Sequence, residues 1–229
     1  MGKRGPKPRG KVKIKWSANF AYAIGLIATD GNLSPDNRHI SFTSIDKEMV
    51  DNFQKALSIS YDYCMKGSGS GSEKKYYVIQ IGDVLFYKFL QSIGLTSNKS
   101  KTIGKIDVPQ KYMRDFIRGS FDGDGCSYSY WDKRWKSSFM LYLEFISASK
   151  KHITWLQDTL RKEIEIKGHI TKSKNQSCFQ LKYAKNESVI LFKYMYKNKE
   201  SLFLTRKYLK IKKSLGIVKK QESINAQVL

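Results

Sequence analysis

Two aspartates occupy matched positions near the ends of two segments with a similar pattern, and paired acids could take part in chemistry. "AYAIGLIATDG" covers residues 21–31 and "DFIRGSFDGDG" covers residues 115–125, and the two align without gaps so that Asp30 matches Asp124. Each aspartate follows an apolar run that predicts a helix, and a glycine follows each aspartate. One Asp-Gly pair would indicate only a turn after a helix. Two copies favour a shared chemical role for the acids.

The two predicted helices also carry small residues at matched positions. Gly25 and Gly119 lie within the apolar runs, although a glycine inside a helix costs about 1 kcal/mol relative to alanine. Faces made of small residues let two helix backbones approach closely. We therefore expect Gly25 and Gly119 at the interface of two parallel, side-by-side helices, which would bring Asp30 and Asp124 together.

Two carboxylates at two helix ends would form an unfavourable pair without a cation. Like charges repel, and each helix C-terminus carries partial negative charge, so a divalent ion between the acids reverses both effects. Carboxylate oxygens and free carbonyls of a last helical turn form a hard-oxygen site that suits Mg²⁺ rather than zinc. The predicted metal site consists of Asp30, Asp124 and the backbone around Thr29 and Gly123.

The elements around the two acids repeat in the same order. Helical and alternating patterns predict αββαββα in each half, hence an α+β fold built as a pseudo-symmetric tandem of two subdomains rather than a solenoid. The N-terminal stretch is rich in Lys, Arg, Gly and Pro, which predicts a mobile basic arm. The expected units are a flexible arm over 1–15, a first subdomain over 16–103, a linker over 104–108, a second subdomain over 109–216 and a C-terminal tail over 217–229.

Charge and composition narrow the class of partner. The 229 residues carry 42 Lys and Arg against 20 Asp and Glu, a net charge of +22, with 41% hydrophobic residues. That balance predicts a folded protein that attracts polyanions. The apolar runs are shorter than a membrane span needs, and the N-terminus lacks the apolar core of a signal peptide. Three widely spaced cysteines predict neither a disulfide framework nor a zinc site, so we expect a reducing compartment, the cytoplasm or an organelle matrix.

The two motifs resemble those of the LAGLIDADG homing endonucleases in their single-chain form. The copies here are "AIGLIATDG" and "IRGSFDGDG", and the resemblance extends over residues 17–215. It implies that Asp30 and Asp124 bind metal, that Thr29 and Gly123 offer backbone carbonyls, and that the motif helices meet between the subdomains. It also implies a saddle of two four-stranded antiparallel sheets over the DNA major groove. The first copy departs from the pattern at Ala28, where the second copy has Asp122, and this position is not the metal ligand in the family.

The resemblance implies further residues near the scissile phosphates. A basic residue from each half corresponds to Lys99 and Lys207, with Lys101 and Arg206 as alternatives. A polar residue that orders the attacking water corresponds to Asp46 in the first half and Ser149 in the second, where the commoner residue is Gln.

The strands carry polar, basic and aromatic residues that could contact DNA. A major groove admits a two-stranded ribbon, and a solvated sheet face would explain any single strand as well as DNA binding would. The predicted DNA-binding residues are Lys74, Tyr76, Gln80, Lys133, Arg134, Lys172, Lys174, Gln180 and Lys182.

Together these features predict a monomeric, site-specific endonuclease that makes metal-dependent double-strand breaks in DNA and originates in a mobile intron or intein. We expect Mg²⁺ as the cofactor, Mn²⁺ as a substitute, and Ca²⁺ to bind without cleavage. The alternatives are an intron RNA maturase of the same fold, a transcription regulator, and a basic binding module that does not cleave. Intact acids at both positions favour the endonuclease.

Overall fold

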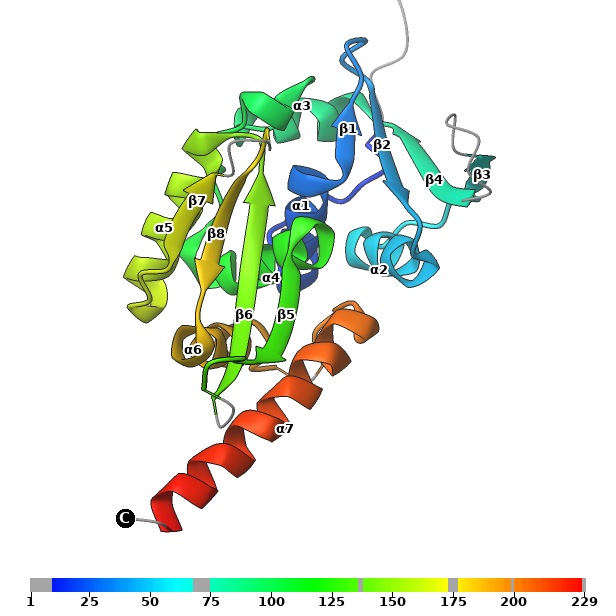
Figure 1. Ribbon diagram of the computed structural model, residues 1–229. Coiled ribbons are helices and arrows are strands. Elements are labelled where there is room, and N and C mark those ends of the chain that lie inside the picture. The colour runs from blue at the N-terminus through cyan, green and yellow to red at the C-terminus, as the bar shows by residue number, and fades with distance from the viewer. Residues whose placement is uncertain (1–9, 68–74, 136–137, 173–176, 199, 228–229) are drawn as a thin grey trace, which may run out of the picture.

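Two copies of one arrangement of helices and strands make up the chain (Figure 1). The computed structural model describes residues 10–67, 75–135, 138–172, 177–198 and 200–227. The first copy consists of α1 (Ala18–Thr29), β1 (Gly31–Leu33), β2 (His39–Ser44), α2 (Lys47–Leu57), β3 (Cys64–Gly67), β4 (Lys75–Gly82) and α3 (Val84–Ser92). The second consists of α4 (Met113–Asp124), β5 (Cys126–Trp131), β6 (Phe139–Ser147), α5 (Lys150–Ile164), β7 (His169–Lys172), β8 (Phe179–Tyr183) and α6 (Lys185–Met195). The predicted αββαββα tandem is confirmed.

Each copy forms one four-stranded antiparallel sheet, as expected. The strand orders are β1-β2-β4-β3 and β5-β6-β8-β7, so the two sheets have the same topology. In Figure 1 the sheets lie on either side of the α1–α4 pair. The inward residues of β2 and β6, such as Phe42 and Leu143, are buried against the helices. One face of each sheet therefore covers the motif helices, and the opposite face of each sheet is open.

The motif helices are core helices rather than amphipathic surface helices. The Ser17 side chain caps α1 by accepting from Phe20 N at 3.1 Å, which satisfies one of the free N–H groups at a helix start. Every residue from Phe20 to Ala28 is buried. Because α1 is enclosed on all sides, its apolar residues do not follow a single helical face.

Two connections pack more closely than the sequence suggests. Within the predicted mobile arm, Val12 is buried, and Lys11 N and Val12 N donate to Asp83 Oδ2 at 2.6 and 3.0 Å. Residues 10–15 therefore lie against the first subdomain, contrary to the expectation for 1–15, while residues 1–9 lie outside the described residues. Within the linker over 104–108, Ile106 and Val108 are buried.

The chain ends in a long helix where a separate tail was expected from residue 217. Two short 3₁₀ turns, Lys99–Lys101 and Gln110–Tyr112, join the halves, and α7 (Thr205–Gln227) follows the second copy without a counterpart in the first. In Figure 1 this helix passes along β5 and continues beyond the sheet. The boundary at 217 is wrong because Val218 is buried against Phe139 and Leu141 and keeps the helix attached.

Candidate active site at the paired helix ends

The motif helices touch along their backbones at two glycines. A Cβ atom built on Gly25 would lie 2.7 Å from Ser120 N, and one built on Gly119 would lie 3.0 Å from Tyr22 C and closer still to Tyr22 O. These contacts with the facing backbone are too short for a Cβ atom, so glycine is needed at both positions for this separation. The close contact explains why the helices accept the propensity cost of glycine.

Close packing brings the two acids to one place. Asp30 is the C-cap residue of α1 and Asp124 is the last residue of α4. A Cβ atom built on Gly123 would lie 2.5 Å from Asp30 Oδ2, so the end of α4 abuts the Asp30 carboxylate. Thr29 Oγ1 donates to Leu26 O at 3.0 Å and to Asp30 Oδ2 at 3.2 Å.

The environment of the acids favours their neutral forms. Burial, and then the negative charge of Asp124, raises the pKa of Asp30 to about 6. Burial also raises the pKa of Asp124, against the opposing effect of Lys207 and Lys99. Two neighbouring carboxyl groups with raised pKa values are typical of functional sites.

A lysine from each half lies beside the acids. Lys99 Nζ donates to the carbonyl of Gly31, next to Asp30. Lys207 Nζ donates to Gly123 O at 2.8 Å and to Gly125 O at 2.6 Å, on both sides of Asp124. Burial lowers the pKa of each lysine to about 8, while the acids act in the opposite direction. The predicted alternative Lys101 is exposed, and Arg206 pairs with Asp46 instead.

The donor set fits a hard divalent ion that keeps part of its own hydration. Clusters of three or more His, Cys, Asp or Glu able to hold a metal do not occur among the described residues. Two carboxylates with backbone oxygens and water are nevertheless the kind of set that suits Mg²⁺, which commonly binds one or two carboxylates plus substrate phosphates. Asp30 and Asp124 would hold the ion. The Gly123 carbonyl, a predicted ligand, accepts from Lys207 in this structure.

A cavity of about 200 Å³ opens beside Asp124. Thr29 and Lys99 of the first half and Asp124 of the second line it, which joins the predicted residues of the two halves. The lining also contains residues that no sequence pattern indicated, because they come from the ends of β6 and β8: Ile146, Ser147, Ala148 and Cys178.

The two residues expected to order water are engaged elsewhere. Asp46 Oδ2 pairs with Arg206 Nε at 2.6 Å. Ser149 is 1% exposed, its hydroxyl donates to Ile103 O at 2.5 Å, and it accepts from His152 N. Ser149 is therefore not among the residues that line the cavity beside Asp124, and its hydroxyl is bonded to the connection between the halves.

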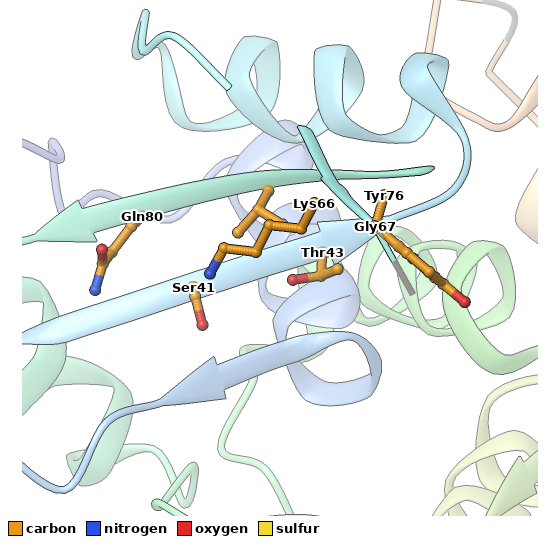
Figure 2. A pocket seen from close by; sticks show the side chains of 7 residues that line it. Ser41, Thr43, Lys66, Gly67, Tyr76 and Gln80 are labelled. Carbon is orange, nitrogen blue, oxygen red and sulfur yellow. The ribbon is translucent and has the colours of Figure 1, made fainter. Parts of the chain in front are cut away.

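The outer face of the first sheet is a polar hollow. Tyr76 and Gln80, both predicted to bind DNA, lie on the same side of β4 and line a cavity of about 460 Å³ with Ser41, Thr43 and Lys66 (Figure 2). Antiparallel pairing places Gln80 opposite Ser41 and Tyr76 opposite Lys66. Lys74 lies outside the described residues.

The outer face of the second sheet is aromatic. Tyr128 and Tyr142 stack with ring centroids 5.0 Å apart, and Tyr130 stacks on both. Glu144 pairs with Lys182 at 3.3 Å. Burial, and then a hydrogen bond to Glu144, raises the pKa of Tyr128. Glu144 thus connects Lys182 with the tyrosine stack.

The structure divides the other predicted DNA-binding residues. Gln180 and Lys182 share the outer face of β8, whereas the register places Lys172 on the opposite side, because it pairs with Phe179. Lys133 and Arg134 are exposed in the turn after β5, and Lys174 lies outside the described residues. A prediction by residue type alone could not separate the two faces of a strand whose alternation is weak.

Asp122 has a role that the sequence did not indicate. It is fully buried, and its Oδ2 accepts from Tyr22 OH and from Leu204 N, each at 2.8 Å. Burial raises its pKa to about 6. Asp122 therefore joins both motif helices to the segment that leads into α7.

Comparison with known proteins gives a family match for the first half of the sequence. Residues 17–94 match the family model described as LAGLIDADG-like domain. The DNA-directed RNA polymerase subunit Rpo1C of Methanocaldococcus jannaschii is 27% identical over 127 residues, which are 52% of this chain. The match spans 14% of that subunit, a small part of its length.

Solved structures match nearly the whole chain. The homing endonuclease I-WcaI bound to its DNA recognition sequence has a TM-score of 0.57 and 16% identity, covering 88% of this chain and 96% of that chain. Full-length DUF199/WhiA from Thermatoga maritima has a TM-score of 0.55 and 13% identity, covering 96% of this chain and 73% of that chain. At these identities the likeness establishes the fold.

The resemblance read from the two motifs is confirmed. The first half matches the model of a LAGLIDADG-like domain, and the chain has the single-chain, two-subdomain fold of LAGLIDADG homing endonucleases. DUF199/WhiA, which is not named as an endonuclease, has the same fold. The fold alone therefore does not decide whether this chain cuts DNA. None of the helices in the described part of the chain is both long and apolar enough to cross a membrane.

Proposed function

We propose that this protein is a site-specific DNA endonuclease that makes metal-dependent double-strand breaks. One observation carries the proposal: two acids meet between two lysines, one from each half, at the ends of a close-packed helix pair between two sheets. A protein that only binds nucleic acid has no need for a carboxylate pair whose charges oppose folding.

Each residue of the site has a role that follows from its contacts. Asp30 and Asp124 would hold a divalent ion, whose chemistry is activation of water and stabilisation of negative charge on phosphate. Lys99 and Lys207 bring positive charge from opposite halves, and lysines held in place beforehand stabilise charge that develops in a transition state. Because each half contributes one acid and one lysine, each half would supply one of each to the cleavage of the two DNA strands.

The remainder of the molecule supports DNA as the substrate. A net charge of +22 supplies attraction to phosphates, and the polar face around Gln80 supplies groups that read bases. We expect a monomer, with Mg²⁺ as cofactor, Mn²⁺ as a substitute and Ca²⁺ supporting binding without cleavage. A mobile intron or intein is the proposed genetic home.

The experiment is cleavage of a randomised double-stranded DNA library in Mg²⁺, followed by sequencing of the ends. The parent should leave paired breaks at one long sequence. Asp30→Asn and Asp124→Asn should abolish these breaks and retain site binding in Ca²⁺, because the binding area lies in the sheets. Asp51→Asn, which removes a partly exposed carboxylate on α2 paired with Lys47, is the matched control and should cleave normally.

Either mutant cleaving at the parental rate would refute the assignment of the acids. Binding of structured RNA with no DNA breaks under any of the three ions would favour the RNA maturase instead.

A further inference from the structure

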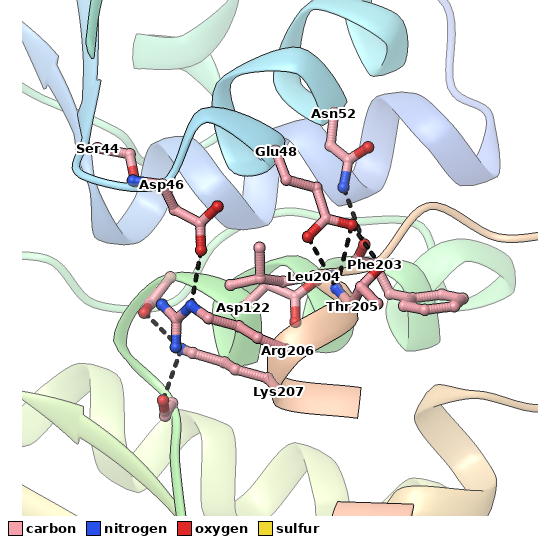
Figure 3. Close-up of polar contacts among 12 residues, drawn as sticks. Ser44, Asp46, Glu48, Asn52, Asp122, Phe203, Leu204, Thr205, Arg206 and Lys207 are labelled. Carbon is pink, nitrogen blue, oxygen red and sulfur yellow. Dashed lines mark hydrogen bonds and ion pairs between the residues drawn. The ribbon is translucent and has the colours of Figure 1, made fainter. Parts of the chain in front are cut away.

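The start of α7 is held by residues of the other half of the molecule. Glu48 of the first half accepts from Thr205 N, with both carboxylate oxygens within 3.2 Å, and from Thr205 Oγ1 (Figure 3). Asn52 Nδ2 donates to Phe203 O at 2.9 Å. Asp46 Oδ2 pairs with Arg206 Nε at 2.6 Å. Three side chains, two from α2 and one from its N-cap residue, therefore hold residues 203–206 in place. Lys207 is the next residue in the chain.

These contacts favour one placement of α7. The first N–H groups of a helix lack partners within the helix, and a carboxylate at that end also interacts favourably with the helix dipole. Glu48 supplies such a carboxylate to Thr205, and Asp122 accepts from Leu204 N. With its first turn fixed in this way, α7 places Lys207 Nζ on the carbonyls around Asp124.

A matching arrangement holds the other lysine. Lys99 lies in the first half, and the turn after it is closed by Ile103 N donating to Lys99 O at 2.7 Å. Ser149 Oγ donates to Ile103 O at 2.5 Å, and His152 Nδ1 lies 2.8 Å from Gly104 O. Ser149 and His152 belong to the N-terminus of α5, in the second half.

The two arrangements occupy equivalent positions in the two subdomains. Asp46 and Ser149 are the N-cap residues of α2 and α5. The N–H of Asp46 donates to Ser44 Oγ at 3.0 Å, and the N–H of Ser149 donates to Ser147 Oγ at 3.1 Å. Thus α2 and α5, the equivalent helices of the two subdomains, each contact the other subdomain through residues at their N-termini.

We propose that each subdomain positions the lysine of the other: Asp46, Glu48 and Asn52 of the first subdomain position Lys207, and Ser149 and His152 of the second position Lys99. These five are positioning residues, because they act through the backbone segments that carry the lysines. The role of the lysines in cleavage rests on the proposed function, whereas their placement does not. The arrangement would place each lysine beside the acids only when the two subdomains are correctly docked.

The first test reads lysine placement directly in the full chain, without metal or DNA. Trace acetylation with acetic anhydride, quantified by mass spectrometry, reports how freely each lysine reacts. Glu48→Ala should raise the labelling of Lys207 about tenfold, the equivalent of one hydrogen bond to a charged group, and leave Lys99 unchanged. Ser149→Ala should raise the labelling of Lys99 and leave Lys207 unchanged.

Conservative and control variants separate positioning from loss of fold. Ser149→Thr retains the hydroxyl and should restore parental labelling of Lys99, and Glu48→Gln retains an acceptor and should have an intermediate effect. Asp51→Asn on α2 and Gln157→Ala on α5 remove contacts that do not reach the lysine segments, and both should label as the parent does. Equal changes at both lysines, or none, would overturn the proposal.

The second test connects placement to cleavage. With a plasmid that carries one site, Glu48→Ala should accumulate a nick in one strand and Ser149→Ala a nick in the opposite strand. A general loss of stability would slow both strands together, and that result would contradict the inference. A parent that cuts neither strand would refute the proposed function, and the labelling experiment would then decide the placement of the lysines by itself.

Discussion

The charge of Asp30, which the proposed metal site requires, is unfavourable for folding. Its pKa of about 6, against an ordinary value of 3.8, means that the folded protein binds its proton more tightly than the unfolded chain does. The charged form therefore opposes folding, and a bound divalent cation would offset this.

We predict that Asp30→Asn raises the free energy of unfolding at pH 7 without metal by on the order of 1 kcal/mol. A carboxyl group with a raised folded-state pKa loses stability as the pH rises from about 4 to about 6, and the penalty is complete above that range. The parent and the variant should thus have similar stability below pH 4 and diverge between pH 4 and 6. Thermal melts in EDTA across this range measure the difference.

Addition of Mg²⁺ provides the complementary measurement. A ligand that binds only the folded state raises the melting temperature, so the parent should gain more than Asp30→Asn. An Asn variant that melts lower in EDTA, with an equal response to Mg²⁺, would mean that the acids are not a shared metal site.

The α1–α4 pair is the element that sets the distance between the acids. Gly25 and Gly119 allow the two backbones to touch, whereas a Cβ atom built on Gly216 in α7 would have no described atom within 4 Å. The same Gly→Ala change should therefore act in opposite directions at the two places.

We predict that Gly119→Ala destabilises the protein by about 1–3 kcal/mol or more, because the added methyl group forces the helices apart. Gly216→Ala should be neutral or stabilising by up to about 1 kcal/mol, since alanine is the better helix former. Chemical denaturation of both variants is the measurement. A neutral Gly119→Ala would show that the helices are not held at this contact.

The whole molecule is strongly basic, and part of its positive charge lies at the N-terminus. Residues 1–9 contain four Lys or Arg, and residues 11 and 12 are fixed to Asp83. Deletions that end at residue 9 or at residue 15 therefore separate the charge of residues 1–9 from the packing of residues 11 and 12.

We predict that deletion of residues 1–9 weakens DNA binding about equally across sequences and leaves the melting temperature unchanged. The slope of log affinity against log salt should fall by about 0.9 for every phosphate that these residues neutralise in the parent. Deletion of residues 1–15 should in addition lower the melting temperature, because it removes Val12 from the core. An unchanged salt slope after the shorter deletion would show that these residues do not contact DNA.

The two sheets should also contribute unequally to recognition. The first presents Ser41, Thr43 and Gln80 around an open hollow, while on the second the ion pair of Glu144 and Lys182 joins a stack of tyrosines. Side chains that are already bonded to one another are less available to read bases. Selection of bound sequences from random DNA should therefore give more specified positions in one half of the site than in the other, and Gln80→Ala should relax that half. Equal information in both halves would contradict this.

The sequence alone determined the features that depend on local pattern. Periodicity predicted the order of helices and strands in both halves, and the gap-free match of Asp30 with Asp124 indicated a paired site, because helix faces and helix ends are set by neighbouring residues. It did not place Lys172 on a face of its strand, predict the helix over residues 205–227, or show that residues 10–15 pack.

Only the tertiary structure decided how the halves join. Asp46 meets Arg206 across 160 positions of sequence, and Ser149 meets Ile103 across 46. Such contacts leave no periodic signal in the sequence, because they depend on how the two subdomains dock against each other. The residues that could hold Lys99 and Lys207 in place thus became identifiable once the subdomains were seen docked through their glycine-lined helices.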